Sequence, residues 1–333
     1  MSLQSSPAKR MKFVSHKSIA TGGLVDDVWI LIEDFAHQPS GLPRVCLGLW
    51  VLLGGRHQQL CVHSRRLPSW VEHNKMRVVT ADLGVWCQEG SANDLAYLGR
   101  CETLQLLKLQ CSSMDIDNRY DGATPQCATI GALVTALGCT RSTFHTLHLN
   151  LSHNLIGDPG AGSLALLGGC HTLRTLQLIV GKSKIGDAGA EALAALRFSP
   201  GLRTLRLGLF WNQIGCIGAK ALAALADSPT LHTLGIDLEG NRIKDEGAGA
   251  LATLINSRTL RTIELKLRDN SIGDRGARDL ARPVNSPQLT IRTLEIDLQT
   301  NLIEDAGVRA FMGSLEHPAP SLHELRLCFQ GNC

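Results

Sequence analysis

A six-residue pattern, typified by LRTLRL, recurs at a nearly constant spacing through the second half of the chain. Successive copies begin 29 residues apart, and the last two intervals are 31 residues. The copies begin at Phe144, Leu173, Leu202, Leu231, Leu260, Ile291 and Leu322. Because one unit of this length cannot bury its own apolar face, such a chain folds as a stack of similar units. Positions within a unit are given below as offsets from its first residue.

Each unit reads as a strand followed by a helix. In the unit that begins at Leu202, the apolar residues Leu205, Leu207 and Leu209 alternate with other residues, which predicts a strand with one buried face. An asparagine at offset ten can both donate and accept hydrogen bonds where the chain leaves the strand. Residues 185–196, IGDAGAEALAAL, then carry apolar side chains at helical spacing. The asparagines are Asn154, Asn212, Asn241, Asn270, Asn301 and Asn332, and Ser183 takes this place in one unit.

Two more positions recur where each helix is expected to begin. An aspartate stands at the N-cap position, where its carboxylate would accept a hydrogen bond from the first turn of the helix. A glycine two residues later leaves room for close packing. We therefore expect each aspartate to cap its own helix. The aspartates are Asp158, Asp187, Asp245, Asp274 and Asp305, and the glycines are Gly160, Gly189, Gly218, Gly247, Gly276 and Gly307.

The whole pattern, L-x-x-L-x-L-x-L-x-x-N-x-I-G-D-x-G-A-x-x-L, resembles leucine-rich repeats of the ribonuclease-inhibitor-like class over about residues 75–333. It departs from the usual pattern by two additional residues between the strand and the asparagine. The resemblance implies an α/β solenoid, or horseshoe, with a parallel concave sheet and convex helices. The first units are degenerate: the one at Leu104 begins 40 residues before Phe144, and a still earlier strand is expected near residues 78–85.

The residues before about 75 lack this period. We expect a flexible tail over residues 1–20 and a helical segment over residues 21–60, in which a leucine, an amphipathic helix ending I-x-x-F, a break, L-x-x-V-C and a tryptophan resemble an F-box. Val25 departs from that pattern, because a proline is usual there. The resemblance implies that an adaptor of a cullin-type ubiquitin ligase binds this segment; the alternative is a helical cap on the first repeat. The adaptor-binding residues would be Leu24, Val28, Ile32, Phe35, Leu42, Val45 and Trp50.

Composition excludes several classes of partner and location. Lys plus Arg number 33 and Asp plus Glu 30, a net charge of +3, which gives no reason to expect nucleic acid or an anionic membrane as partner. No apolar run reaches the length of a membrane span, and the N-terminal residues have no apolar stretch typical of a secretory signal. We therefore expect a cytoplasmic or nuclear protein, and residues 9–12, KRMK, resemble a short nuclear-import signal.

The chain is expected to be neither an enzyme nor a metalloprotein. It has no phosphate-binding loop, HExxH or GxSxG motif, so we predict no catalytic residue and no cofactor. Its 11 cysteines are scattered and form no paired CxxC units, so we predict no metal site. Residues 115–122, DIDNRYDG, lack the glycine and glutamate positions of a calcium loop and are interpreted as a polar surface insertion.

Side chains at offsets two, four and six are expected on the concave sheet. Threonine is nearly constant at offset two, whereas offsets four and six vary as a binding surface would. From Leu231 onward these offsets carry five acids against Lys266 and Arg326, which predicts a basic protein partner; the alternative is that these side chains are merely solvated. Exposed aromatics just after one strand would anchor it. The candidate residues are Arg206, Phe210, Trp211, Asp237, Glu264, Lys266, Glu295, Asp297 and Arg326.

Three functions fit these patterns. The first is a substrate receptor of a cullin-type ubiquitin ligase, in which the repeats hold the target protein. The second is a plain leucine-rich-repeat scaffold with a helical N-terminal cap. The third is an activator of a small GTPase, because activators of the Ran GTPase share this class of repeat, but no motif in this chain supports that function.

Overall fold

A computed structural model describes residues 57–63, 67–74, 80–86, 98, 101, 103–111, 130–131, 133–135, 137, 144–315 and 319–332. The chain divides into two compact units, Met1–Leu47 and Gly48–Cys333, and every described residue belongs to the second unit. The F-box-like residues between Leu24 and Trp50, the basic cluster at residues 9–12 and the insertion at 115–122 lie outside the described residues.

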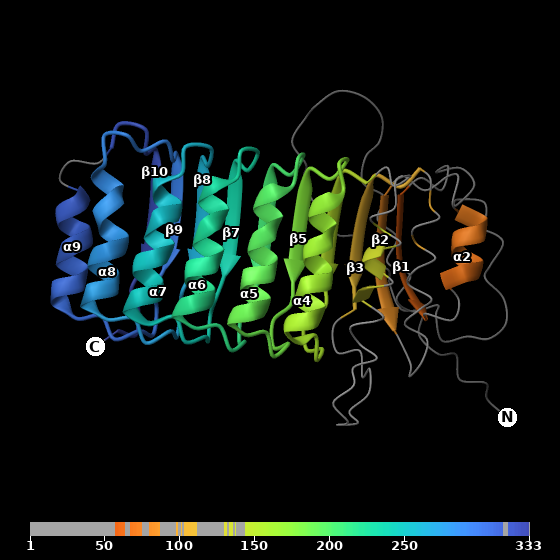
Figure 1. Ribbon diagram of the computed structural model, residues 1–333, viewed down its shortest axis with the longest axis horizontal. Coiled ribbons are helices and arrows are strands. Elements are labelled where there is room, and N and C mark those ends of the chain that lie inside the picture. Colours follow the sequence, from red (N-terminus) through yellow and green to blue (C-terminus); the bar gives the residue numbers. More distant parts are fainter. Residues whose placement is uncertain are drawn as a thin grey trace, which may run out of the picture. The chain divides into compact units, whose positions relative to one another are not determined.

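One parallel sheet of ten strands runs through the second unit (Figure 1), and its strand order is the chain order. Strands of successive repeats pair in register, so that residues at the same offset stand opposite each other, as Thr175 does to Thr204. The strands are β1 (His57–His63), β2 (Thr80–Trp86), β3 (Leu106–Gln110), β4 (Thr146–Asn150), β5 (Thr175–Ile179), β6 (Thr204–Gly208), β7 (Thr233–Asp237), β8 (Thr262–Lys266), β9 (Thr293–Asp297) and β10 (Glu324–Cys328).

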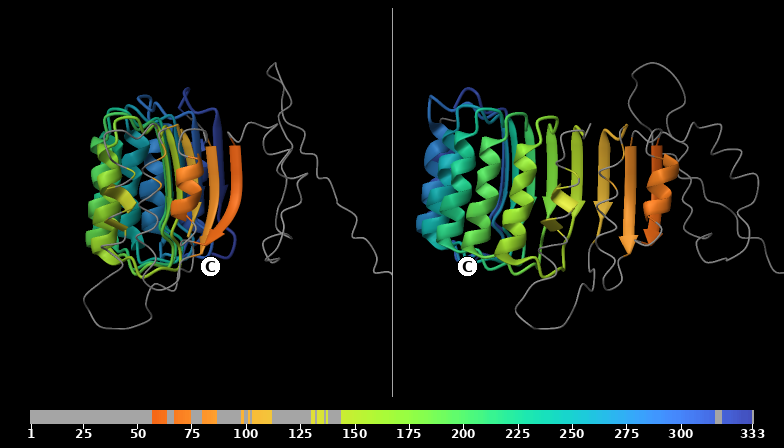
Figure 2. Two further views of the ribbon diagram at one scale, coloured as in Figure 1. Left: turned by 90° about the vertical axis from the view of Figure 1, so that its right-hand side faces the viewer. Right: turned by 45° about the vertical axis from the view of Figure 1, so that its right-hand side comes forward.

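Helices α4 to α9 form a second layer over one face of this sheet (Figure 2), and short 3₁₀ helices follow α4 to α8. The helices are α2 (Leu67–Asn74), α4 (Gly157–Ala165), α5 (Asp187–Ala194), α6 (Cys216–Ala223), α7 (Lys244–Leu251), α8 (Asp274–Ala281) and α9 (Asp305–Leu315). The 3₁₀ helices are η3 (Leu166–Gly169), η4 (Ala195–Phe198), η5 (Ala224–Asp227), η6 (Ala252–Asn256) and η7 (Arg282–Asn285). The predicted α/β solenoid with a parallel sheet is thus confirmed.

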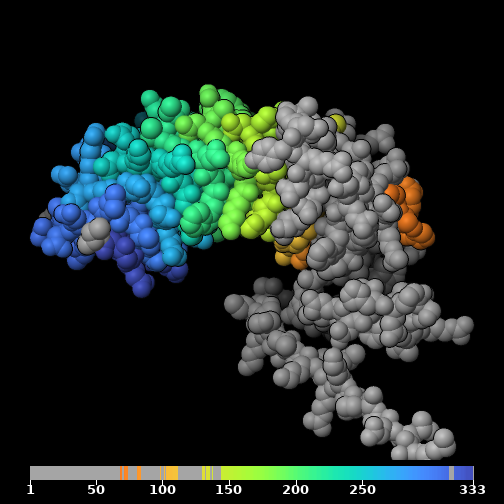
Figure 3. Space-filling model, turned by 90° about the horizontal axis from the view of Figure 1, so that it is seen from below, coloured from red at the N-terminus to blue at the C-terminus, as the bar shows by residue number. Residues whose placement is uncertain are grey.

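The strand expected near residues 78–85 is β2, and β1 pairs with it in parallel. The sheet therefore includes a strand that lies upstream of residue 75, where the resemblance to leucine-rich repeats begins. Seen from the edge at which the strands end (Figure 3), the repeats from β4 onward follow one another as bands in chain order.

Burial alternates along each strand as the period of two predicts. On β6, Leu205 and Leu207 are almost completely buried, whereas Arg206 between them is exposed. The buried strand residues and the apolar residues of the helices form one continuous hydrophobic core from Val71 to Ala319. Each repeat therefore buries its apolar face against both neighbours.

The asparagines at offset ten hydrogen-bond to backbone groups, as their position predicted. The Nδ2 group of Asn212 donates to the carbonyl oxygens of Val180 and Leu209 at 3.0 and 2.9 Å. Its Oδ1 atom accepts hydrogen bonds from the backbone N–H groups of Ser183 and Ile185, both at 3.0 Å. One buried amide thus joins two consecutive repeats.

The aspartates at the start of the helices do not cap their own helices, so that prediction is wrong for Asp187, the first residue of α5. No side chain caps the N-terminus of α5 from its own N-cap residue, Gly186. The Oδ1 atom of Asp187 instead accepts hydrogen bonds from the N–H groups of Gly215 and Gly218, at 2.7 and 2.8 Å, where α6 begins. The reason is that the stacked helices place the first-turn side chain of one helix beside the unpaired N–H groups of the next.

The same transfer of a carboxylate to the following repeat occurs at α5, α8 and α9. The aspartates that supply the carboxylate are Asp158, Asp245 and Asp274, which accept hydrogen bonds from the N–H groups of Gly186 and Gly189, of Gly273 and Gly276, and of Glu304 and Gly307. The recurring glycine is required at this contact. A Cβ atom on Gly189 would lie 2.6 Å from Oδ1 of Asp158, too close for any side chain.

Helix α7 has no such carboxylate, because Cys216 stands where the preceding repeat would supply an aspartate. Its backbone begins differently. The N-cap residue of α7, Ile243, is in the helical region and Lys244 has a φ of +55°, whereas Gly215 before α6 is extended with a φ of −103°. The first turn of α7 closes on itself through a hydrogen bond from the Gly247 N–H group to the Ile243 oxygen at 3.2 Å.

Candidate functional site

The face of the sheet that helices α4 to α9 do not cover is called the open face here (Figure 2). It corresponds to the expected concave side and carries offsets two, four and six of each strand, because the residues between them are buried. The parallel register brings equal offsets of neighbouring strands side by side. The candidate residues of the open face therefore form two rows across the strands, at offset four and at offset six.

The offset-four row extends further than the sequence predicted. Its charged residues upstream of β4 are Asp82 and Lys108, which the degenerate early repeats concealed, although Leu107 and Leu109 on either side of Lys108 give the strand pattern. Burial lowers the pKa of His148, and the charge of neighbouring Lys108 lowers it further. In order from β2 to β10 the row is Asp82, Lys108, His148, Gln177, Arg206, Gly235, Glu264, Glu295 and Arg326.

Arg206 crosses a whole strand to reach Glu264. Its Nη1 atom lies 2.5 Å from Oε2 of Glu264, although β7 stands between their strands. The crossing depends on Gly235, which has no side chain at this point of β7; a Cβ atom there would lie 3.3 Å from Cγ of Arg206. Lys266 lies 3.3 Å from the other carboxylate oxygen of Glu264, so two cations hold this side chain in place.

Glu295 of the offset-four row and Glu324 at offset two also pair with a cation within the sheet. Arg326 lies 3.8 Å from Glu295 and 2.7 Å from Glu324. Arg206 lies before Leu231 and so outside the residues in which the sequence showed five acids against two bases, and its ion pair with Glu264 offsets part of that negative charge. The expected basic character of the partner stays a prediction.

In the offset-six row, Lys266 stands between Asp237 and Asp297 of the two neighbouring strands. Burial raises the pKa of Asp237, although a hydrogen bond from the Glu239 N–H group, 3.1 Å long, and the charge of Lys266 oppose the rise. Burial alone would lower the pKa of Lys266, but the carboxylates around it, first that of Glu264, raise it overall. Along this row, from β7 to β9, three partly buried side chains thus alternate in charge.

The two aromatic candidates lie in the loop after β6, and their rings pack against glycines of the adjacent repeats. The ring of Phe210 occupies the space that a side chain on Gly181 would take, and a Cβ atom on Gly240 would lie 2.6 Å from Cδ2 of Trp211. Trp211 nevertheless remains 48% exposed. An exposed ring that is already fixed in place loses little conformational freedom on binding, which suits an anchor.

The described residues hold no group of three or more His, Cys, Asp or Glu side chains that could bind a metal ion. None of the helices in this part of the chain is long and apolar enough to cross a membrane. An open hollow of about 850 Å³ lies on the helix side, between α6–η5 and α7–η6. Its wall consists largely of small side chains, such as Ala223, Ala226 and Ala250.

A family model that matches part of the chain agrees with the repeat pattern. A solved structure of a Bacteroides fragilis protein is 14% identical, with a TM-score of 0.44, over 85% of this chain and 82% of that one. No curated protein matches the sequence significantly. A family model described as a leucine-rich repeat matches residues 145–165, 169–194, 228–252 and 257–281. Within these four stretches the chain is similar to leucine-rich repeats, and none of them extends to residues 21–60.

Proposed function

We propose that this chain is a non-catalytic scaffold that binds a protein partner on the open face between β6 and β10. The proposal rests on how much the residue type varies between repeats at core positions and at positions on the open face. Core, asparagine and glycine positions repeat from unit to unit, whereas offsets four and six differ in almost every unit. A surface that only had to be solvated would not need side chains held in place by ion pairs across strands, as Arg206 and Glu264 are.

The partner is proposed to present a basic segment. Asp237 and Asp297 flank Lys266 and hydrogen-bond only to loop N–H groups in the described residues, of Glu239 and Gln299 at 3.1 and 2.9 Å. The raised pKa of Asp237 means that its ionised form is poorly solvated in the free protein, since burial is the main cause. A cation delivered by a partner would stabilise that carboxylate more than it would a fully exposed one.

A charge-reversal experiment tests this surface. The full-length chain serves as bait, and the affinity for the recovered partner is measured at low and high salt. Replacing Glu264, Glu295 and Asp297 together by Lys should abolish binding. The control replaces Glu191, Glu246 and Glu304, exposed residues in the helices or at their N-terminal ends, and changes the net charge equally. Equal affinity of both triple variants would show that the partner binds elsewhere.

A finer proposal is that the chain is the substrate receptor of a cullin-type ubiquitin ligase. Its support is the F-box-like sequence of residues 21–60 alone, and a plain scaffold with an N-terminal cap is the alternative. Because β1 begins at His57, the informative truncation removes Met1–Leu47, the first compact unit, and leaves the sheet intact. Cullin and adaptor subunits should be recovered with the full chain and lost with the truncated one. Their absence from the full-length sample would exclude the receptor.

Point substitutions distinguish the receptor from the cap. Changing Ile32 and Phe35 to Ser should abolish adaptor binding while the circular dichroism and melting temperature of the repeats stay unchanged. If the melting temperature of the repeats falls instead, the segment packs on the first repeat and the plain scaffold is the better description.

A further inference from the structure

Arginines collect along one edge of the sheet, the edge at which the strands begin. We call this the amino edge; it consists of residues 144–145, 166–174, 195–203, 224–232, 252–261, 282–292 and 319–323, which lead from each 3₁₀ helix or loop into the next strand. Asp227 is the only acid in these segments. Their arginines are Arg174, Arg197, Arg203, Arg258, Arg261, Arg282 and Arg292.

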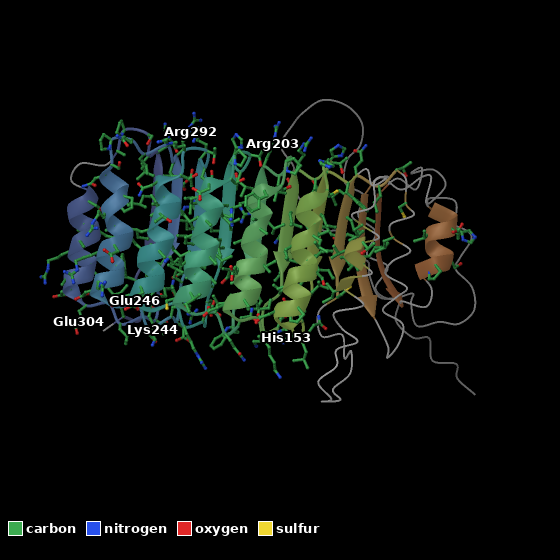
Figure 4. All side chains as sticks on the ribbon, viewed as in Figure 1. His153, Arg203, Lys244, Glu246, Arg292 and Glu304 are labelled. Atoms are coloured by element: carbon green, nitrogen blue, oxygen red, sulfur yellow. The ribbon has the colours of Figure 1, made fainter. Side chains whose placement is uncertain are left out.

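The opposite edge, where the strands end, has the opposite charge. Its segments, residues 151–158, 180–187, 209–216, 238–245, 267–274, 298–305 and 329–332, carry five Lys and Arg against eight Asp and Glu. With His neutral, the formal charge is −3 at this edge and +6 at the amino edge. Figure 4 shows Arg203 and Arg292 at the amino edge and His153, Lys244 and Glu304 at the other. A chain with a net charge of only +3 thus separates its charges along the strand direction.

The core of the amino edge is the row at offset one. The register of the strands places its members next to one another, in the order His145, Arg174, Arg203, His232, Arg261, Arg292 and His323. With strands about 4.8 Å apart, the row is about 29 Å long and one residue wide. An extended polypeptide of about nine residues has the same length.

Pairing with the carbonyl groups at the ends of the α-helices does not explain why arginines occupy this row. Arg197, which is not part of it, lies 3.5 Å from the Ala194 oxygen at the end of α5, as expected for a cation near a helix C-terminus. Within the row, Arg174 and Arg261 donate hydrogen bonds to loop carbonyls. Arg203 and Arg292 are exposed and form no ion pair among the described residues, so their guanidinium groups are available to a partner.

Two of the three histidines of the row are held in one orientation by hydrogen bonds. The Nδ1 atoms of His232 and His323 lie 2.7 Å from the carbonyl oxygens of Thr230 and Ser321. A nitrogen that faces a carbonyl must carry the proton, which leaves Nε2 of each ring turned away from that carbonyl. His232 and His323 therefore add imidazole groups to the exposed guanidinium groups of Arg203 and Arg292 along this row.

We propose that the offset-one row is a second binding surface, independent of the open face, and that it takes an extended acidic polypeptide segment. Guanidinium groups match carboxylates in pairs of hydrogen bonds, and the row has the length and width of one extended chain. Nucleic acid is less favoured because single strands bind on aromatic platforms. No member of the row is Phe, Tyr or Trp, and Arg197 covers one face of nearby Phe198, 4.2 Å from its centroid.

Fluorescence anisotropy of the full-length chain with a labelled peptide of nine glutamates tests the proposal. Binding should weaken steeply as salt rises, because the contacts are exposed charges. Replacing Arg203 and Arg292 together by Ser should weaken it on the order of tenfold, and replacing both by Lys should weaken it less. The matched control, Lys182 and Lys184 to Ser, removes the same charge from the opposite edge and should leave the affinity within about twofold.

Three results would overturn the proposal. The first is no binding of the peptide by the unaltered chain at low salt, and the second is an equal loss in the arginine and lysine variants. The third is tighter binding of a single-stranded oligonucleotide than of the peptide at equal charge, which would make nucleic acid the partner. Because Arg203 and Arg292 are exposed, circular dichroism of the variants should match that of the unaltered chain.

Discussion

At the scale of single residues, neighbouring positions on one strand have opposite roles. Leu207 on β6 is 1% exposed and Arg206 beside it faces the open face. We expect Leu207→Asp to destabilise the protein by about 3–5 kcal/mol, because it buries a carboxylate without a partner. Arg206→Asp should cost much less, since the Arg206 side chain is 48% exposed and lies outside the core. Denaturant unfolding measures both, and equal midpoints would contradict the strand register.

Asp237 should make stability depend on pH. Its pKa is raised in the folded protein by burial, so the folded state holds the proton more tightly than the unfolded state does. Stability contributed by this group is therefore present at low pH and lost as pH rises through the ordinary and then the raised pKa. Asp237→Asn, which keeps an acceptor for the Glu239 N–H group, should raise the melting temperature at pH 7 and leave it unchanged at acid pH. A lower melting temperature at pH 7 would show that the carboxylate stabilises the fold.

At the scale of helices, the carboxylate that caps a helix belongs to the repeat before it. Asp187→Ala should therefore lower the free energy of unfolding by about 1 kcal/mol through α6, not through α5. Asp305→Ala is the matched control, because that side chain is highly exposed and its described contact is an i,i+4 pair with Arg309 at 4.0 Å. Hydrogen exchange in the Asp187 variant should rise at Gly215 and Gly218. Faster exchange at the start of α5 instead would contradict the assignment.

The sequence allowed the strands from β2 onward, the offsets of the core and the role of Asn212 to be predicted, because most of them follow from a period that repeats many times, whereas β1 lies before the repeats begin and was not predicted. It did not reveal which helix Asp187 caps. The position of a residue within one repeat does not tell how close its side chain lies to the next repeat. The Arg206–Glu264 pair joins residues 58 positions apart and depends on the missing side chain of Gly235, which no local pattern marks as important. Lys108 was missed for another reason, namely that its repeat lacks most of the recurring residues.

At the scale of the whole repeat array, the boundary between α6 and α7 differs from the others on its helix side. Cys216 supplies no carboxylate to α7, and the open hollow lined by Ala223 and Ala250 lies between the same two repeats. The asparagine connection persists there, since the Nδ2 group of Asn241 donates a hydrogen bond to the Leu209 oxygen.

We expect the amide hydrogen-exchange rates of the helices before this boundary to differ from those of the helices after it. Cys216→Asp should reduce the difference and raise the unfolding free energy by about 1 kcal/mol, whereas Cys216→Ser should not. Identical exchange on both sides in the unaltered chain would contradict the boundary.

Because each carboxylate acts on the helix that follows, the coupling between repeats has a direction. When a repeat detaches from the N-terminal side, it takes with it the cap of the next helix, as Asp158 would leave α5 uncapped. When one detaches from the C-terminal side, every remaining helix keeps its cap. Under mechanical load the array should therefore unzip more easily from its N-terminal side than from its C-terminal side. Helix α7 receives no carboxylate from α6, so the loss of the α6 repeat does not uncap it. Unfolding from the N-terminal side should therefore pause at α7.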